Sequence, residues 1–303
     1  MGMPDAQDRA WFRSVFMARS HLKSSFEWQN FVTEFMQARH PGKFYQVDPS
    51  GRGDKGCDGW VEGLMLACYG ATNPKPDYVK NKMKTDFTSA RTYWKDKMQK
   101  WAFVHNNYIG LAYMVVEGMM DLQEEADDVE IQCWPPQVLW DHCTEDITRE
   151  QLCDLLGAPP TDHPAGMTYI ARCVESLART RLSTDLEGIP PVPYGKIEHN
   201  EFSDEVVQLI LRIQPHTDHV RYFFQRSSPG EQDSVSQNLR ERYDGLLAKL
   251  QNPDAVFHAL CDELIAEAFP GREGGAEERS AAMMVVTYFF EQCEIFKAPP
   301  EGS

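Results

Sequence analysis

The chain has 303 residues, of which 42% are hydrophobic and 25% are charged, which is the composition of a globular protein. This composition excludes disordered and fibrous classes, and the length allows two domains with adequate cores. The longest strongly apolar run, residues 281–290, is about half the length that a bilayer requires, and the N-terminus lacks a basic segment followed by an apolar signal core. The sequence therefore predicts a cytoplasmic protein that does not contact a membrane.

The eight cysteines are scattered, without a Cys-x-x-Cys pair or a Cys/His cluster at zinc spacing. We therefore expect reduced, mostly buried thiols.

The net charge of −16 is distributed unevenly along the chain. Residues 37–110 contain 12 Lys/Arg and 7 Asp/Glu, whereas residues 111–303 contain 14 Lys/Arg and 35 Asp/Glu. Because a polyanion is attracted to positive surface, we expect any DNA or RNA contact to lie within residues 37–110.

The first part of the chain predicts helices interleaved with strands. A helix carries Trp28, Phe31, Val32 and Phe35 and ends at Pro41-Gly42. A long helix follows the next strands, with an apolar seam at Met83, Phe87, Ala90, Trp94 and Met98, and a further helix covers residues 109–124. The predicted strands are residues 43–47, 57–61, 64–69, 101–106 and 129–134. This order requires crossover connections, so it predicts a mixed sheet flanked by helices.

No strand pattern recurs after Pro135. Residues 147–182 predict two or three short helices, and DLEGIPPVPYGK, residues 185–196, predicts a semi-rigid proline-rich connector. The sequence thus predicts an α/β domain over residues 1–143, a helical and Pro-rich connector over 144–195, and a C-terminal helical interaction domain over 196–303.

Four helices are predicted in the last region. One is capped by Ser203 and ends at Pro215, one carries Val235, Leu239, Tyr243, Leu246 and Leu250, and one opens on Asn252-Pro253-Asp254. The fourth, SAAMMVVTYFFEQCEIF, is apolar nearly all round, so it must lie at the centre of a bundle or against a partner chain.

The stretch GRGDKGCDGW, residues 51–60, precedes a predicted hairpin, as in some metal-dependent nucleases. In one common arrangement, an Asp opens the first strand of the hairpin, and a carboxylate and a lysine separated by one residue lie on the second. Asp58 is the candidate Asp, and Glu34 of the preceding helix is a candidate further ligand of Mg²⁺. The two remaining positions hold Ala67 and Tyr69, which cannot ligate a cation or replace an ammonium.

Several runs of the chain together resemble a known family. FYQVDPSGRGDKGCDGW, LACYGA, KMKTDFTSARTYW, WAFVHNN and IQCWPPQVL resemble the restriction-endonuclease-like (PD-(D/E)XK-type) domain in components of bacterial ABC-three component anti-phage defence systems. KIEHNEFSDEVV through AAMMVVTYFFEQCEIFKAPP resembles the helical C-terminal domain of the same proteins. The resemblance implies a restriction-endonuclease-like mixed sheet, then a helical linker region and a C-terminal helical bundle. It also implies a linking or effector subunit that works with an ABC-type or SMC-like ATPase and other subunits.

Other residues are candidates to restore the incomplete site. Asp54 lies in the loop, Glu62 lies at the tip of the hairpin, and Lys82 or Lys84 of the next helix could reach back in place of the missing lysine. The alternative is that the loop is only a turn, in which Gly allows positive φ and Asp caps backbone amides.

A basic flank on the long helix is the candidate nucleic-acid surface. Lys80, Lys84, Arg91 and Lys95 line one side of the helix, and Arg52 and Lys55 precede them in the loop. Such cations contact phosphates without reading bases, but the same pattern also fits a solvated helix face.

The histidines give little indication of a site. His216 and His219 lack further ligands and lie next to Pro215, and His105 is better explained as a turn cap. Three functions therefore remain open. The first is a nuclease-like subunit that binds nucleic acid, a partner ATPase or both, with little hydrolysis of its own. The second is an active Mg²⁺-dependent nuclease, and the third is a pure protein scaffold.

Overall fold

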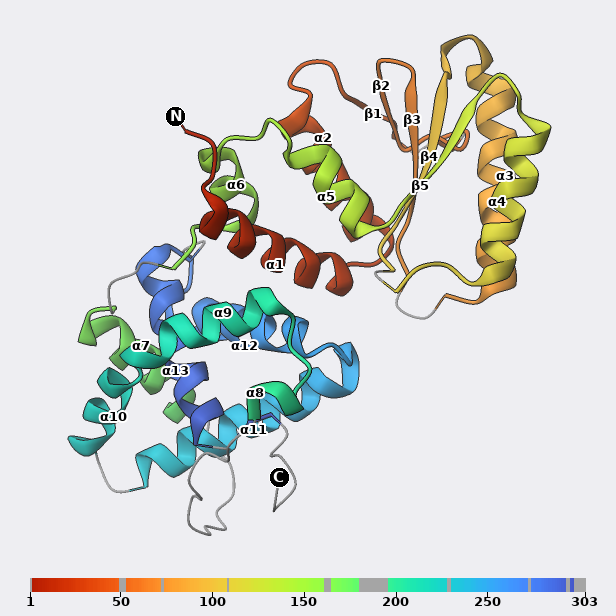
Figure 1. Ribbon diagram of the computed structural model, residues 1–303. Helices are drawn as coiled ribbons and strands as arrows, with labels where there is room; N and C mark the ends of the chain where they lie inside the picture. The colour runs from red at the N-terminus through yellow and green to blue at the C-terminus, as the bar shows by residue number, and fades with distance from the viewer. Residues whose placement is uncertain are drawn as a thin grey trace. The chain divides into compact units, whose positions relative to one another are not determined.

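The computed structural model describes residues 2–48, 53–71, 74–107, 109–160, 165–179, 196–227, 230–271, 274–292 and 295–296 (Figure 1). The chain forms two compact units. The N-terminal unit comprises Met1–Met3 and Arg19–Gln151, and the C-terminal unit comprises Pro4–Ala18 and Leu152–Ser303. Two helices, α1 (Ala6–Leu22) and α6 (Arg149–Leu156), contribute residues to both units.

The N-terminal unit alternates helices and strands as the sequence predicts. Its elements are α2 (Ser25–Arg39), β1 (Tyr45–Gln46), β2 (Gly59–Val61), β3 (Leu64–Tyr69), α3 (Pro76–Trp94), η1 (Lys95–Lys97), β4 (Lys100–His105), α4 (Tyr113–Glu125), β5 (Glu130–Trp134) and α5 (Pro136–Thr144). The five strands form one sheet in the order β1-β2-β3-β4-β5. The β1-β2 and β2-β3 pairs are antiparallel, whereas the β3-β4 and β4-β5 pairs are parallel, so the predicted mixed sheet is confirmed.

Helices cover both faces of this sheet (Figure 1). The parallel pairs require crossover connections, and α3 and α4 supply them and pack together on one face. On the other face, α2 contacts β3 and α5 contacts β4. Met65 and Ala67 of β3 and Trp101 and Phe103 of β4 enter the core with α3 and α4, because alternate strand residues face the same side.

Helix α3 is shorter than the predicted seam. Met83, Phe87 and Ala90 are buried, and Trp94 packs against the same core. The helix ends at Trp94, and Lys95–Lys97 form a 3₁₀ turn. Met98 therefore reaches the core from extended backbone rather than from the helix.

The C-terminal unit is helical in the part that the structure describes. Its further elements are α7 (Met167–Arg179), α8 (Lys196–His199), α9 (Asp204–Ile213), η2 (Gln214–His216), α10 (Asp218–Gln225), α11 (Glu231–Leu250), α12 (Pro253–Ala268) and α13 (Ala276–Glu291). Ser203 accepts a hydrogen bond from Val206 N, and Asn252 accepts one from Ala255 N, so both predicted N-caps are confirmed.

The apolar helix α13 lies at the centre of the C-terminal unit. It contacts α7, α9, α10 and α12, and every residue from Glu278 to Phe290 is buried. Packing within the chain thus explains a helix that is apolar on all sides.

Helix α7 belongs to the same bundle, although the sequence placed it in a connector. Ile170, Cys173, Val174 and Leu177 follow the spacing of one helix face, and all four are fully buried. The division into units thus differs from the predicted boundaries at residues 143 and 195, because this face packs on α11, α12 and α13. The proline-rich run at residues 185–195 lies outside the described residues.

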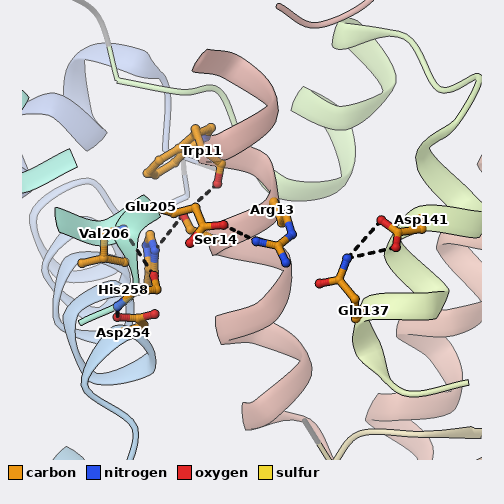
Figure 2. Close-up of polar contacts among 10 residues, drawn as sticks. Trp11, Arg13, Ser14, Gln137, Asp141, Glu205, Val206, Asp254 and His258 are labelled. Atoms are coloured by element: carbon orange, nitrogen blue, oxygen red, sulfur yellow. Dashed lines mark hydrogen bonds and ion pairs between the residues drawn. The ribbon is translucent and has the colours of Figure 1, made fainter. Parts of the chain in front are cut away.

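The N-terminal part of α1 also packs in the C-terminal unit (Figure 2). Trp11 is buried, and its ring meets the edge of His258 at 5.6 Å between centroids. His258 Nε2 lies 3.2 Å from Ser14 Oγ, and Arg13 forms an ion pair with Glu205. Sequence patterns did not indicate this long-range packing.

Among the described helices, none combines the length and the apolar character needed to span a bilayer.

Candidate functional site

Asp58 has a fixed place at the start of the β2-β3 hairpin. Its backbone N–H donates to Leu66 O at 2.7 Å, and its Oδ2 accepts a hydrogen bond from Cys68 N at 2.6 Å. The strands are joined by Glu62 and Gly63, which both have positive φ. The antiparallel ladder therefore positions the Asp58 carboxylate beside β3, as the sequence predicted for a hairpin Asp.

The glycine-rich loop before Asp58 lies directly against α3. Gly56 has φ +73°, and a Cβ added there would lie 1.9 Å from the backbone oxygen of Asp86. Asp54 Oδ1 accepts a hydrogen bond from Gly56 N at 2.8 Å, so Asp54 shapes the turn. Only glycine fits this contact, and the contact brings the loop and α3 together.

Four charged residues interact where the loop meets α3. They are Asp54 and Asp58 from the loop and Lys82 and Asp86 from α3. Lys82 Nζ donates to Asp86 Oδ2 at 2.5 Å, one helical turn away. The cluster holds three carboxylates and one ammonium, so its formal charge is negative when all four residues are ionised.

Burial and neighbouring charges shift the pKa values in this cluster. Burial raises the pKa of Asp58 to about 6, and Asp54 and Asp86 also raise it, whereas the Cys68 hydrogen bond and Lys82 lower it. Burial lowers the pKa of Lys82, but the hydrogen bond and charge of Asp86 outweigh burial, so this pKa is raised. Lys82 therefore stays charged as the internal counter-ion of the cluster.

Ala67 and Tyr69 do not contribute to cation binding. Ala67 is 1% exposed and lies in the core beneath α3. The Tyr69 ring stacks on Phe103 at 5.8 Å, and burial raises the pKa of its phenol. An apolar methyl and a neutral phenol thus occupy the positions that a hydrolytic hairpin needs for a carboxylate and a lysine.

The structure brings some of the predicted residues to Asp58 and leaves others elsewhere. Asp54 and Lys82 join it, but Glu34 is exposed on α2 and is not among the charges that shift the pKa of Asp58. Glu62 pairs with Lys43 at 2.7 Å, and Lys84 lies 3.6 Å from Asp121. Of the four possible replacements, two are therefore near Asp58 and two are engaged elsewhere.

The sequence patterns did not identify Asp86 as a candidate site residue. The signal that could have found it is its position four residues after Lys82, the spacing at which a lysine and a carboxylate pair on a helix.

The described side chains do not fit a magnesium ion. Within the described part of the chain, no group of three or more His, Cys, Asp or Glu side chains is placed to hold a metal ion. Asp86, the carboxylate that α3 brings toward Asp58, is already paired with Lys82. A hard cation would have to displace this ammonium before it could share the carboxylates.

The basic flank of α3 faces an acidic row on α4 and the loop that follows it. Lys80 lies 3.5 Å from Glu117, and Arg91 Nη2 donates to Asp128 Oδ1 at 2.6 Å. Together with Lys84 and Asp121, these pairs link the two helices along one side. Phosphate contact through these three cations would have to displace carboxylates.

The other basic candidates have different surroundings. Lys95 is exposed in η1, and Lys55 Nζ lies over the Tyr93 ring at 4.9 Å from its centroid. Arg52 lies outside the described residues. Nucleic-acid binding by this set therefore stays a prediction.

His105 caps a turn, as the sequence favoured. It is buried, and its Nδ1 accepts a hydrogen bond from Asn107 N at 3.3 Å. Burial lowers the pKa of His105 to about 4, so the imidazole is neutral at physiological pH.

Comparison with known families bears on the C-terminal unit. Residues 169–297 match the model of C-terminal domain 10 of the ABC-three component (ABC-3C) systems. The match starts in α7 and includes α13. It supports the assignment of the chain as a subunit of an ABC-three component system. Such an assignment implies other subunits of the system as partners. No curated protein and no solved structure matches the chain.

Proposed function

We propose that the chain is a linking or effector subunit of a cytoplasmic anti-phage defence complex, in which a nuclease-like N-terminal unit recognises its target without hydrolysing it. The match over residues 169–297 supports the assignment to an ABC-three component system. The order of strands and helices and the placement of Asp58 on a hairpin support a restriction-endonuclease-like, PD-(D/E)XK-type origin for the N-terminal unit.

The position of Lys82 is the main support for the proposal that the N-terminal unit does not hydrolyse nucleic acid. Its ammonium pairs with Asp86 and acts on Asp58 and Asp54, so a cation of the chain itself offsets part of the negative charge of the carboxylates. A metal-dependent phosphodiesterase uses such carboxylates to hold Mg²⁺ and to activate water. With Ala67 in the core, β3 supplies no carboxylate to compete with Lys82.

The proposed partners are an ABC-type or SMC-like ATPase and the other subunits of the system, together with DNA or RNA at residues 37–110. That segment has an excess of Lys and Arg over Asp and Glu, whereas the rest of the chain does not. The C-terminal unit is the proposed attachment to the complex, because the family match lies there.

The catalytic part of the proposal is tested by titrating Mg²⁺ and Mn²⁺ into the full chain by calorimetry. Wild type is compared with Asp58→Ala, and plasmid cleavage is assayed on the same samples. We expect no Asp58-dependent binding and no cleavage. Binding that disappears in Asp58→Ala, together with nicking by wild type, would favour the alternative function, an active nuclease in which Lys82 replaces the missing lysine.

Complex formation is tested separately by co-expressing the full chain with the ATPase of the same system. We expect the two proteins to co-elute in size-exclusion chromatography as a species larger than either alone. Separate elution at every tested concentration and nucleotide state would contradict the role as a linking subunit. Co-elution by a chain that binds neither DNA nor RNA at low salt would favour the pure scaffold.

A further inference from the structure

A pocket of about 700 Å³ opens in the N-terminal unit, next to the edge strand β1. The Asp58 cluster does not contribute to it. Its lining comes from β1 and the residue after it, the β2-β3 hairpin, the end of α3 and the segment that leads to β4. The lining residues include Tyr45, Trp60, Glu62, Trp94, Asp96 and Lys97.

Three aromatic side chains dominate this pocket, which we call the aromatic pocket. Tyr45 is 60% exposed, and its ring lies 5.8 Å from that of Trp60, with an interplanar angle of 43°. Trp60 Nε1 donates to Lys97 O at 3.1 Å, and Trp94 packs partly against the core. The structure thus holds aromatic surface in place at a solvent-open cavity, as a stacking site requires.

Positive charge without an ion pair lies beside the aromatic pocket. Lys95 and Lys97 are exposed, and among the described residues neither forms an ion pair, whereas Lys80, Lys84 and Arg91 all face carboxylates. Asp96 offsets part of this charge. Of the basic residues on α3 and η1, those beside the aromatic pocket are therefore the ones available to a phosphate.

The surroundings of the pocket favour one kind of ligand. The Glu62 carboxylate pairs with Lys43 at 2.7 Å, and Asp96 lies next to Lys97 in the lining. The lining therefore has no excess of negative charge, which an organic cation in an aromatic cage would favour. The edge strand β1 has two residues, which is too short to recruit an extended peptide by strand pairing. A planar base with an attached phosphate matches both the aromatic surface and the lysines.

We propose that the aromatic pocket binds an unstacked base of a single-stranded nucleic acid, with Tyr45 and Trp60 as the stacking surface and Lys97 at the phosphate. Bases in a duplex are stacked on one another and cannot enter such a pocket. This inference rests on the proposed function, because it names the ligand of the N-terminal unit. It also places the nucleic-acid contact at the edge of the sheet, rather than on the basic flank of α3, whose Lys80, Lys84 and Arg91 pair with carboxylates.

The test is fluorescence anisotropy of labelled single-stranded DNA and RNA of about 12 nucleotides, long enough for a stacking site. The full chain is titrated at about 50 mM salt, where phosphate contacts are strong, and with EDTA to exclude metal effects. Tyr45→Ala is compared with Tyr113→Ala, since Tyr113 is 82% exposed and lies outside the pocket. Lys97→Ala is compared with Lys249→Ala, since Lys249 is exposed on α11 and lies outside residues 37–110.

We expect Tyr45→Ala to weaken binding by at least about fivefold, the loss of one stacking contact. Lys97→Ala should weaken binding and reduce its salt dependence, whereas both control variants should bind as wild type does. Because Tyr45 and Lys97 are exposed, neither substitution should unfold the unit.

Several results would overturn the inference. One is the absence of binding to single-stranded DNA and RNA at low salt. The others are an equal loss of affinity in the pocket and control variants, and binding to a duplex as tight as to a single strand. Competition by a mononucleotide as effective as that of the oligonucleotide would show a free nucleotide as the ligand. If no oligonucleotide binds and Tyr45→Ala abolishes ATPase co-elution, the pocket is a protein-docking site. If the full chain does not co-elute with the ATPase but the aromatic pocket still binds the oligonucleotide, only the proposed function is contradicted.

Discussion

Lys82 and Asp86 form an ion pair within α3 that also acts on the hairpin carboxylate Asp58. The pair joins the helix to the loop electrostatically, because Asp54 and Asp58 both help to keep Lys82 charged. The contact between Gly56 and the backbone of Asp86 joins the same two segments sterically. The loop, the hairpin and α3 therefore meet around charged side chains in the N-terminal unit.

Asp58→Asn should stabilise the protein at neutral pH and have little effect near pH 4. The pKa of Asp58 is about 6 in the folded protein and 3.8 ordinarily, so the folded state binds the proton more tightly between these values. The stability that this proton contributes is complete below pH 3.8 and is lost as the pH rises through 6. Asparagine avoids that loss and still accepts the hydrogen bond from Cys68 N.

The measurement is chemical denaturation of wild type and Asp58→Asn between pH 4 and pH 7.5. We expect the variant to be more stable by on the order of 2 kcal/mol at pH 7.5, with the difference shrinking toward pH 4. The control is Asp77→Asn, which changes a carboxylate in the first turn of α3. A constant difference across this pH range would show that the Asp58 carboxylate is not desolvated.

Gly56→Ala should destabilise the N-terminal unit severely. The added methyl would lie 1.9 Å from Asp86 O, and φ at this position is +73°. We expect a loss of at least about 3 kcal/mol in the free energy of unfolding, because a backbone group of α3 must move. Gly53→Ala is the matched control: φ is +79°, and an added Cβ would have no atom of the other described residues within 4 Å apart from its chain neighbours, so it should cost only about 1 kcal/mol. Equal losses in urea denaturation would show that strain in φ alone, rather than the contact with α3, is responsible.

Lys196→Met should destabilise the C-terminal unit. Lys196 is 2% exposed, and its Nζ donates to Phe290 O at 2.6 Å and to Ile295 O at 2.7 Å. It thereby satisfies backbone carbonyls at and beyond the end of α13, where a positive charge is also favourable. Methionine fills similar volume without a donor, so we expect a loss of about 3 kcal/mol in urea denaturation.

The comparison variant for Lys196→Met is Lys249→Met, which changes an exposed residue in the last turn of α11. It should alter the free energy of unfolding by less than about 0.5 kcal/mol. Similar values for the two lysines would mean that the buried ammonium does not stabilise the end of α13.

Trp11→Ala should destabilise the C-terminal unit, even though the family match begins at residue 169. Trp11 is 2% exposed, packs on His258, and lies 5.4 Å from the Arg279 guanidinium. We expect a loss of about 3 to 5 kcal/mol, measured by circular dichroism during denaturation. Leu211→Ala on α9, at 44% exposure, should cost far less. If both variants unfold like wild type, residues 4–18 are dispensable to this unit.

Local patterns in the sequence predicted most of the secondary structure. Short apolar runs bounded by turn residues marked the strands, and the caps at Ser203 and Asn252 marked two helix starts, because these signals depend on neighbours in the chain. The order of elements then required a mixed sheet between helices. The absence of a carboxylate at Ala67 and of a lysine at Tyr69 was likewise visible in the sequence itself.

Only the tertiary structure decided which charges meet. The flank of Lys80, Lys84 and Arg91 looked free in the sequence, but α4 and the residues after it supply its carboxylates from about 37 residues further along the chain. Asp86 joined Asp58, and Pro4–Ala18 joined the C-terminal unit, through packing between distant segments. Periodicity reports which face of a helix is buried, but it does not report the partner, because contact between remote segments depends on how all the elements pack together.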